Sequence, residues 1–286
     1  MKKFTMVLLL IMFIICIRNS YSQCSDAGVC IIGNTHKKTK TEISASSLSF
    51  QYSIGFSGPP EDIIFHTLKF GGDLSVSDDF SIGVVLPVYS LVYKDQNTLN
   101  QNGIGDGFII GNYITPTGKN QNISFQGGFK LNTSSVDKEK FGYYNAQGSN
   151  DLILGVDYNY SFLNFSGGVQ IPLTNYKDAD GNTFIRGADV MVRAGLQRRA
   201  GNLKIKFELL GIKRLTESEN IYNGGTTSKI PNSDFFQLNI MGGLLFNFSP
   251  KFLVDFGVAL PMIKREDNTD GTKRVFTTNL GIRYNI

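Results

Sequence analysis

The sequence holds two histidines, His36 and His66, the side chains best suited to acid–base chemistry near neutral pH. His66 is followed by Thr67, which does not provide the Ser–His pairing that a membrane phospholipase needs, although a serine on another segment remains an open alternative. His36 lies in a polar, basic stretch and is expected to be exposed. We therefore predict that the chain is not an enzyme.

Two cysteines outside the first apolar run, Cys24 and Cys30, form the motif CSDAGVC. Such a pair can form a disulfide or contribute to a soft-metal or redox site. One pair of thiols without a nearby His or Met cluster is weak evidence for a metal. The stretch DADGN at 178–182 lacks the terminal Glu of a calcium loop and is better read as a turn. We expect neither a metal nor a cofactor.

The first residues have the pattern of a secretory signal peptide. Lys2 and Lys3 precede an apolar run over residues 6–17, and small and polar residues follow up to Ser22. The run is too short for a spanning helix of ~20 residues. We predict a signal peptide at 1–22, a periplasmic segment with the cysteine pair at 23–41 and a folded domain at 42–286. Export to an oxidising compartment favours a Cys24–Cys30 disulfide.

The charge balance gives no evidence for nucleic-acid binding. The whole chain has 28 basic and 24 acidic residues, and loss of Lys2, Lys3 and Arg18 with the signal leaves 25 against 24. A nearly neutral exported chain lacks the basic excess that phosphate binding requires. We therefore expect no nucleic-acid partner.

Apolar and polar residues alternate through most of the remaining chain. Residues 252–262, FLVDFGVALPM, carry an apolar side chain at every second position, which is the period of a β-strand. We count twelve such strands, long enough for the ~9–11 residues that cross a bilayer at a tilt. One facing is ambiguous, because Phe108, Ile109 and Ile110 are consecutive.

The core of that strand recurs as GVVLP at 83–87, GVQIP at 168–172 and GVALP at 257–261. A proline has no N–H to donate to the ladder and is tolerated at bulges or strand ends. We therefore expect three matching irregularities at Pro87, Pro172 and Pro261, all at the extracellular rim of their strands.

Connections between the predicted strands alternate in length. Connections of odd number are mostly long and polar, while those of even number are mostly short. Outer-membrane barrels have this arrangement, with short periplasmic turns, longer extracellular loops and an even strand number. In lipid every backbone N–H and C=O needs an internal partner, so the sheet of a membrane-spanning β protein must close into a barrel. The sequence predicts an all-β fold, a twelve-stranded antiparallel transmembrane β-barrel.

The residues that alternate with the apolar ones form a second row on each strand, and this row would then face the lumen. Charged residues in this row nearly cancel, and Asp151 and Arg214 belong to it as well. They would either line a polar passage that orients a solute or satisfy one another in a packed interior. Arg193, Lys204 and Lys206 are the predicted solute-facing basic patch. The lumen-lining candidates are Lys69, Asp73, Lys130, Asp157, Asp189, Arg193, Lys204, Lys206, Glu208, Asp255 and Arg283.

Short motifs resemble one family of outer-membrane barrels. GIGDG at 103–107, GSNDLILGVDYNYSF at 148–162 and VQIP at 169–172 are similar to segments of the transporter-like family labelled after the meta-pathway of phenol degradation. The resemblance implies a barrel and passage of small organic molecules, and carries over no binding residues. The alternating end of the chain, with Tyr284 third from last, resembles the terminal strand signal of these barrels, although Ile286 stands where an aromatic is usual.

Taken together, the sequence predicts a channel or transporter-like barrel for passive passage of a small, unidentified solute. It would sit in the outer membrane of a Gram-negative bacterium, in contact with lipid, and engage the barrel-assembly machinery through its C-terminal strand. The alternatives are an outer-membrane enzyme acting on lipid and a structural or adhesive barrel with a blocked lumen. Oligomeric state is left open.

Overall fold

A computed structural model of the chain describes residues 45–57, 62–93, 100–118, 121–134, 149–177, 181–263 and 274–286. Seventeen β-strands lie in these ranges. None of the residues in them belongs to a helix long and apolar enough to cross a membrane. The predicted signal peptide and the residues Cys24, Cys30 and His36 lie outside the described residues.

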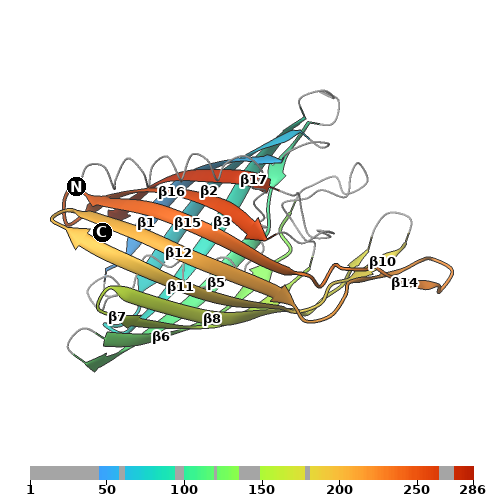
Figure 1. Cartoon of the computed structure of the whole chain (residues 1–286), viewed down its shortest axis with the longest axis horizontal. Helices are drawn as coiled ribbons and strands as arrows, with labels where there is room; N and C mark the ends of the chain where they lie inside the picture. Colours follow the sequence, from blue (N-terminus) through green and yellow to red (C-terminus); the bar gives the residue numbers. More distant parts are fainter. Residues whose placement is uncertain are drawn as a thin grey trace, which may run out of the picture.

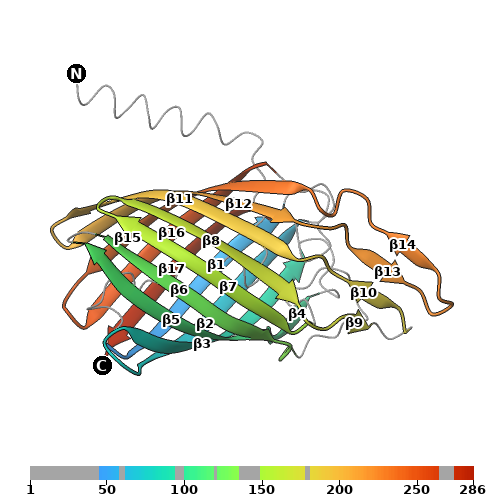
Figure 2. The ribbon, with the colours of Figure 1, turned by 90° about the horizontal axis from the view of Figure 1, so that it is seen from below.

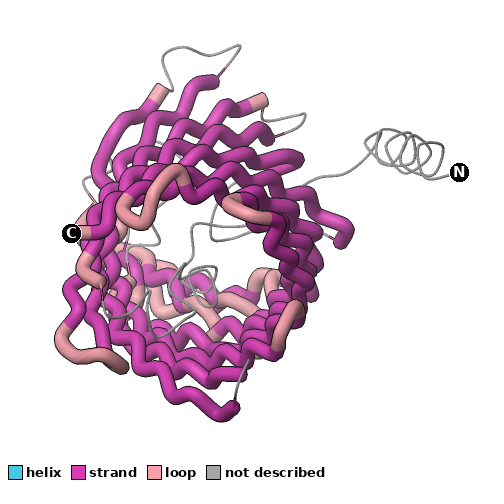
Figure 3. The backbone as a smooth tube through the Cα atoms, turned by 90° about the vertical axis from the view of Figure 1, so that its left-hand side faces the viewer, coloured by secondary structure: helices cyan, strands magenta, loops and turns pink. Residues whose placement is uncertain are grey.

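Twelve long strands form the wall of a closed antiparallel barrel, as predicted (Figure 3). Each pairs with its neighbours along the chain, and β1 pairs with β17 to close the ring, with Phe50 opposite Ile282. Closure gives each of the twelve wall strands two neighbours, so the described wall does not end in a sheet edge. The wall strands are β1 (Ser47–Ser57), β2 (Ile63–Ser75), β3 (Phe80–Tyr93), β5 (Gly107–Gly118), β6 (Gln121–Leu131), β7 (Asp151–Tyr160), β8 (Leu163–Pro172), β11 (Asp189–Ala200), β12 (Leu203–Arg214), β15 (Phe236–Asn247), β16 (Phe252–Ile263) and β17 (Arg274–Asn285).

The two ends of the barrel differ in the length of their connections. At one end, two-residue turns join β7 to β8 and β11 to β12, and Gly201 in the second turn adopts a φ of +60°, which suits a tight hairpin. Both described chain ends also lie there, with the N–H of Ile286 donated to the carbonyl of Ser46 at 2.9 Å. At the other end the wall strands are joined by connections of 10 to 21 residues, except for five residues between β1 and β2. We call the two ends the short-turn end and the long-loop end.

Two of the long connections carry a small second sheet, which we call the loop sheet. Its strands are β9 (Tyr176–Lys177), β10 (Thr183–Ile185), β13 (Glu219–Ile221) and β14 (Thr227–Lys229). They pair in the order β14-β13-β10-β9 and pair with no described wall strand. The loop sheet projects beyond the long-loop end of the barrel (Figures 1 and 2). The sequence predicted these residues only as parts of long, polar connections.

The two rows of each wall strand have opposite environments. Phe125, Phe165 and Phe256 of the outer row are 51%, 45% and 45% exposed, whereas Ser124 and Ser166 of the inner row are 4% and 5% exposed. Large apolar side chains are exposed on every wall strand, far more than a water-soluble surface tolerates. The barrel is therefore apolar outside and largely polar inside, which is the arrangement of a membrane-spanning barrel.

The three repeated prolines occupy three different positions. Leu86 and Pro87 lie opposite the three residues Gly105–Gly107, so the side of the ladder that holds β5 and the short strand β4 (Gln101–Ile104) has one extra residue. A Cβ on Gly105 would lie 2.9 Å from the Pro87 ring, so this bulge requires a glycine. Pro261 also adjoins a register shift, whereas Pro172 ends β8. The expected common position at the rim is wrong for Pro87, which lies in the middle of β3.

Candidate functional site: the charged inner wall

The inner row contains the predicted lumen-lining residues. Asp157, Arg193 and Glu208, with four others, are at most 8% exposed. Lys69, Asp73, Lys204 and Lys206 are partly exposed. Their role in lining a passage stays a prediction. The seven buried members are Lys130, Asp157, Asp189, Arg193, Glu208, Asp255 and Arg283.

Six charged side chains form one connected network just inside the long-loop end, which we call the charge belt. The Lys130 ammonium lies 3.2 Å from the carboxylate of Asp106 and 3.1 Å from that of Asp151. The Arg214 guanidinium donates to both carboxylate oxygens of Asp189 at 3.2 and 3.1 Å. The sixth member, Arg186, joins these two halves. The members of the charge belt are Asp106, Lys130, Asp151, Arg186, Asp189 and Arg214.

Strand register creates the pairs of the charge belt. Lys130 of β6 lies directly opposite Asp151 of β7, and Asp189 of β11 lies directly opposite Arg214 of β12. Directly opposed residues on one face have Cβ atoms ~5 Å apart, which suits an ion pair. A slip of one residue would turn these charges toward the outer face.

Arg186 comes from the segment between β10 and β11 rather than from the wall. Its guanidinium contacts Asp151 through a short ion pair and lies 3.6 Å from the carboxylate of Asp189. Gln170 of β8 also donates to Asp151. Arg186 thus bridges β7 and β11 across β8 and makes the belt continuous.

The charge belt is deeply buried and electrically balanced. Lys130, Asp151 and Arg214 are at most 1% exposed. Burial of a charge is costly unless a partner and hydrogen bonds offset the lost hydration. Three cations face three anions, and Ser149 adds a hydrogen bond to Asp151 at 2.7 Å. The belt therefore carries no net charge.

Two further polar groups lie closer to the short-turn end. Arg193 lies 3.9 Å from Glu208, which also accepts a hydrogen bond from Asn164 at 3.2 Å. Asn279 donates to Asp255 at 3.3 Å, and the charges of Arg283 and Lys206 act on the same carboxylate. Charged side chains of both signs thus lie together in these two groups as well as in the charge belt.

The predicted basic patch is not one cluster. Arg193 lies opposite Leu210, whereas Lys206 lies opposite Gln197, four residues farther along β11. At about 3.4 Å per residue, Arg193 and Lys206 are separated by roughly 14 Å along the wall. Glu208 lies between them and pairs with Arg193. Only Lys204 and Lys206 remain adjacent in the inner row.

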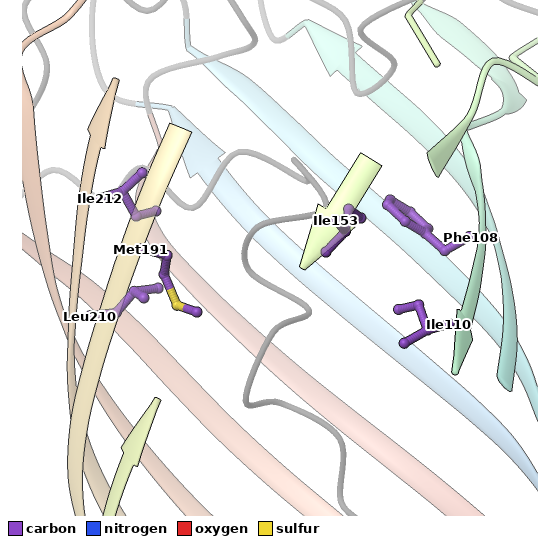
Figure 4. Packing of buried hydrophobic residues seen from close by; sticks show 6 residues of the cluster. All are labelled: Phe108, Ile110, Ile153, Met191, Leu210 and Ile212. Atoms are coloured by element: carbon purple, nitrogen blue, oxygen red, sulfur yellow. The ribbon is translucent and has the colours of Figure 1, made fainter. Parts of the chain in front are cut away.

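Apolar side chains form a layer directly below the charge belt, which the sequence did not reveal. Along their strands, Ile153 and Met191 are the next residues after Asp151 and Asp189 whose side chains face inward. They are 1% and 0% exposed. Figure 4 shows three of these side chains on each side of the barrel interior. A second buried group lies on β2 and β3. The first group is Phe108, Ile110, Ile153, Met191, Leu210 and Ile212, and the second is Ile63, Phe65, Tyr89, Leu91 and Tyr93.

The signal for this apolar layer is a break in alternation. Phe108, Ile109 and Ile110 are consecutive, and so are Leu209 and Leu210. Where both rows are apolar, periodicity cannot say which side chain faces inward. Strand alternation predicts an inward position for four members of the belt but not for Asp106 and Arg186, which precede their strands.

His66 lies on the outer face, away from the charged inner wall. Its Nδ1 shares a hydrogen bond of 2.6 Å with the hydroxyl of Tyr52, and the two rings stack with centroids 6.1 Å apart. A tyrosine thus occupies the place that a serine would take in a Ser–His pair. Among the described residues no group of three His, Cys, Asp or Glu side chains could hold a metal ion.

Comparison with known proteins identifies the fold but not a family. No protein-family model and no curated protein matches the sequence. An outer-membrane channel from Pseudomonas putida F1 is similar in structure, with a TM-score of 0.64 at 12% identity over 84% of this chain and 94% of that chain. The NanC porin gives 0.51 at 10% identity over 85% and 100%. The translocator domain of the autotransporter NalP from Neisseria meningitidis gives 0.52 at 9% identity over 90% and 93%. At such identities the likeness extends to the barrel fold alone.

Proposed function

We propose that this barrel is an outer-membrane channel that lets small solutes pass down their gradient. The observation that carries the proposal is the division between an apolar outer row and an inner wall of paired charges. Lipid-facing side chains place the barrel in a bilayer, and an inner wall with polar groups gives a solute partners along its path. Outer-membrane channels and porins share the fold.

The inner wall favours solutes that combine polar and apolar parts. The balanced charge belt precedes an apolar layer that includes Met191 and Leu210, and the Arg193–Glu208 pair follows. A strongly charged solute would gain little from a belt with no net charge. We therefore propose small organic molecules as the solute class, in keeping with the resemblance to the family labelled after phenol degradation.

Conductance across a planar bilayer tests the proposal, with neighbouring residues of β12 as a matched pair. Lys206 is partly exposed on the inner row and Phe207 is 45% exposed on the outer row. Modification of K206C with a bulky charged thiol reagent should lower the conductance, because the reagent enters the path. Modification of F207C should leave it unchanged. Folded protein that carries no current and no solute flux would contradict the proposal.

The alternatives give different outcomes in the same preparation. An enzyme acting on lipid would lose activity in the His66→Ala variant while it remained folded, and Tyr52 is the observed partner of that histidine. A structural or adhesive barrel would carry no flux and would depend on the loops, especially residues 216–233. We propose the channel and not the enzyme.

The N-terminal features stay part of the proposal. We propose that residues 1–22 are a cleaved signal, that 23–41 lie in the periplasm of a Gram-negative cell and that Cys24 and Cys30 form a disulfide. We also propose that the barrel-assembly machinery binds β17. Mass spectrometry of the exported protein tests the first part: an intact N-terminus or two free thiols would contradict it.

A further inference from the structure

The loop sheet is connected to the barrel by two pairs of chain segments. The segments next to β11 and β12 touch each other, and the N–H of Leu215 donates to the carbonyl of Ala188 at 2.8 Å. A Cβ on Gly187 would lie 2.6 Å from the Thr216 hydroxyl and 2.9 Å from Cγ of Arg214, so the contact is as close as a glycine permits. A movement of one segment must therefore move the other.

Side chains tie these segments to the charge belt. Arg214 donates to the Ser218 hydroxyl at 3.0 Å, and the N–H of Ser218 donates to the Ser233 hydroxyl at 2.8 Å. Arg186 enters the belt from the other side and binds Asp151 on β7. The connections that carry the loop sheet join β8 to β11 and β12 to β15, so β7 is not directly linked to the loop sheet in the chain. The Arg186–Asp151 contact therefore ties the loop sheet to one further wall strand.

Arg186 has the geometry of a clamp. Its two terminal nitrogens contact different carboxylates, Nη2 that of Asp151 and Nη1 that of Asp189. A guanidinium binds two anions through separate nitrogens held in one plane, whereas a lysine must bind both through one ammonium, as Lys130 does, and so fixes their relative position less. Arg186 is 7% exposed, so water competes little for these contacts.

We propose that Arg186 is a positioning residue that fixes the loop sheet relative to the barrel and so keeps the long-loop mouth in one shape. Without it, the loop sheet moves across the mouth. The effect on current rests on the proposed channel function, whereas the effect on the position of the sheet does not.

Two measurements on the same full-length protein separate these effects. Spin labels at T227C on β14 and L131C at the rim of β6, with Cys24 and Cys30 replaced by Ser, report the distance between sheet and wall by electron paramagnetic resonance in lipid. Bilayer recordings report the current. Arg186→Ala should broaden the distance distribution and add sub-conductance levels, and Arg186→Lys should give an intermediate result.

Two further variants guard against loss of folding and against a general charge effect. The double variant Asp151→Asn with Arg186→Gln removes one anion and one cation, so the belt stays balanced while the clamp is lost, and it should behave as Arg186→Ala does. Arg198→Ala is the control, because Arg198 is an exposed arginine near the opposite end of β11. It should match the wild type in both measurements.

Each outcome decides the proposal. An unchanged distance distribution in both Arg186→Ala and the double variant overturns it. A broadened distribution with a steady current shows that the sheet moves without reaching the passage and overturns the claim about the mouth. A broadened distribution in a protein that never conducts supports the role of Arg186 and refutes the channel function instead.

Discussion

At the scale of single residues, the environment of an ion pair decides its effect on stability. Arg214 and Lys213 are neighbours on β12, and each pairs with an aspartate. Arg214 and its partner Asp189 are 0% and 2% exposed, whereas the side chains of Lys213 and Asp234 are 44% and 33% exposed. Loss of one partner leaves a buried carboxylate in the first case and a solvated one in the second.

We expect Arg214→Ala to lower the free energy of unfolding by about 3–5 kcal/mol, because Asp189 would lose its bidentate partner inside the wall. Lys213→Ala is the matched control and should cost about 0–1 kcal/mol. Denaturant titration of protein folded in lipid vesicles measures both. Equal losses in the two variants would contradict the assignment of the charge belt as a buried network.

Strand alternation in the sequence predicts the side of the wall on which most charges lie, but not their partners. The rows place Lys130 and Asp151 on the inner face because their strands alternate clearly. That Lys130 lies opposite Asp151 is a matter of register between β6 and β7, and the loop that joins these strands is too long to fix the register. Arg186 could not be predicted at all, since it lies in the segment between β10 and β11 rather than in an alternating strand.

At the scale of strands, glycines on the inner face make room for large neighbours. Gly128 of β6 lies opposite Ile110 of β5 and Ile153 of β7, so a small residue separates two large ones. A Cβ there would lie against the backbone carbonyl of Ile109 and 2.9 Å from the Cα of Ile110. These are backbone atoms, which cannot move without shifting the strand.

We therefore expect Gly128→Ala to destabilise the barrel by about 1–3 kcal/mol or to reduce the folded fraction, through overpacking. Gly127 is the adjacent control: a Cβ there meets only Leu154, at 3.8 Å on the outer face, so Gly127→Ala should be neutral. Heat-modifiable migration on gels measures the folded fraction. A harmless Gly128→Ala would show that β6 can yield at this point.

The predictability of each strand follows from its two rows. The twelve wall strands were predicted because apolar outer and polar inner rows give a clear period of two. The facing of the strand that contains Phe108 was ambiguous, because Phe108 and Ile110 are apolar inward residues beside an apolar outward Ile109. The loop sheet was missed because strands of two or three residues, such as β9 and β14, are too short to show any period.

At the scale of the whole molecule, the apolar outer band sets where the barrel can reside. Val156 lies near the middle of β7 and is 42% exposed, while Tyr160 ends the same row and is 45% exposed. The two side chains are similarly exposed but should lie at different depths in the membrane, because the middle of a wall strand meets acyl chains and its end meets the interface. Charge tolerance should therefore follow position along the strand.

We expect Val156→Arg to cost about 2–4 kcal/mol of folding free energy in lipid, and Tyr160→Arg about 0–1 kcal/mol, because the second charge reaches the interface. Unfolding titrations in vesicles compare the two variants. A similar small cost for both would mean that the middle of β7 does not face hydrocarbon.

The pairing of β1 with β17 has a consequence for the order of assembly. This contact joins residues 47–57 to the last strand, so the most distant parts of the chain must meet before the ring is complete. Neighbouring hairpins can form early at little entropic cost, whereas this closure waits for the final twelve-residue strand and is the slow step. A chain interrupted before Arg274 would leave β1 and β16 as bare edges that invite aggregation. We therefore expect the C-terminal strand to set the rate at which the barrel is completed.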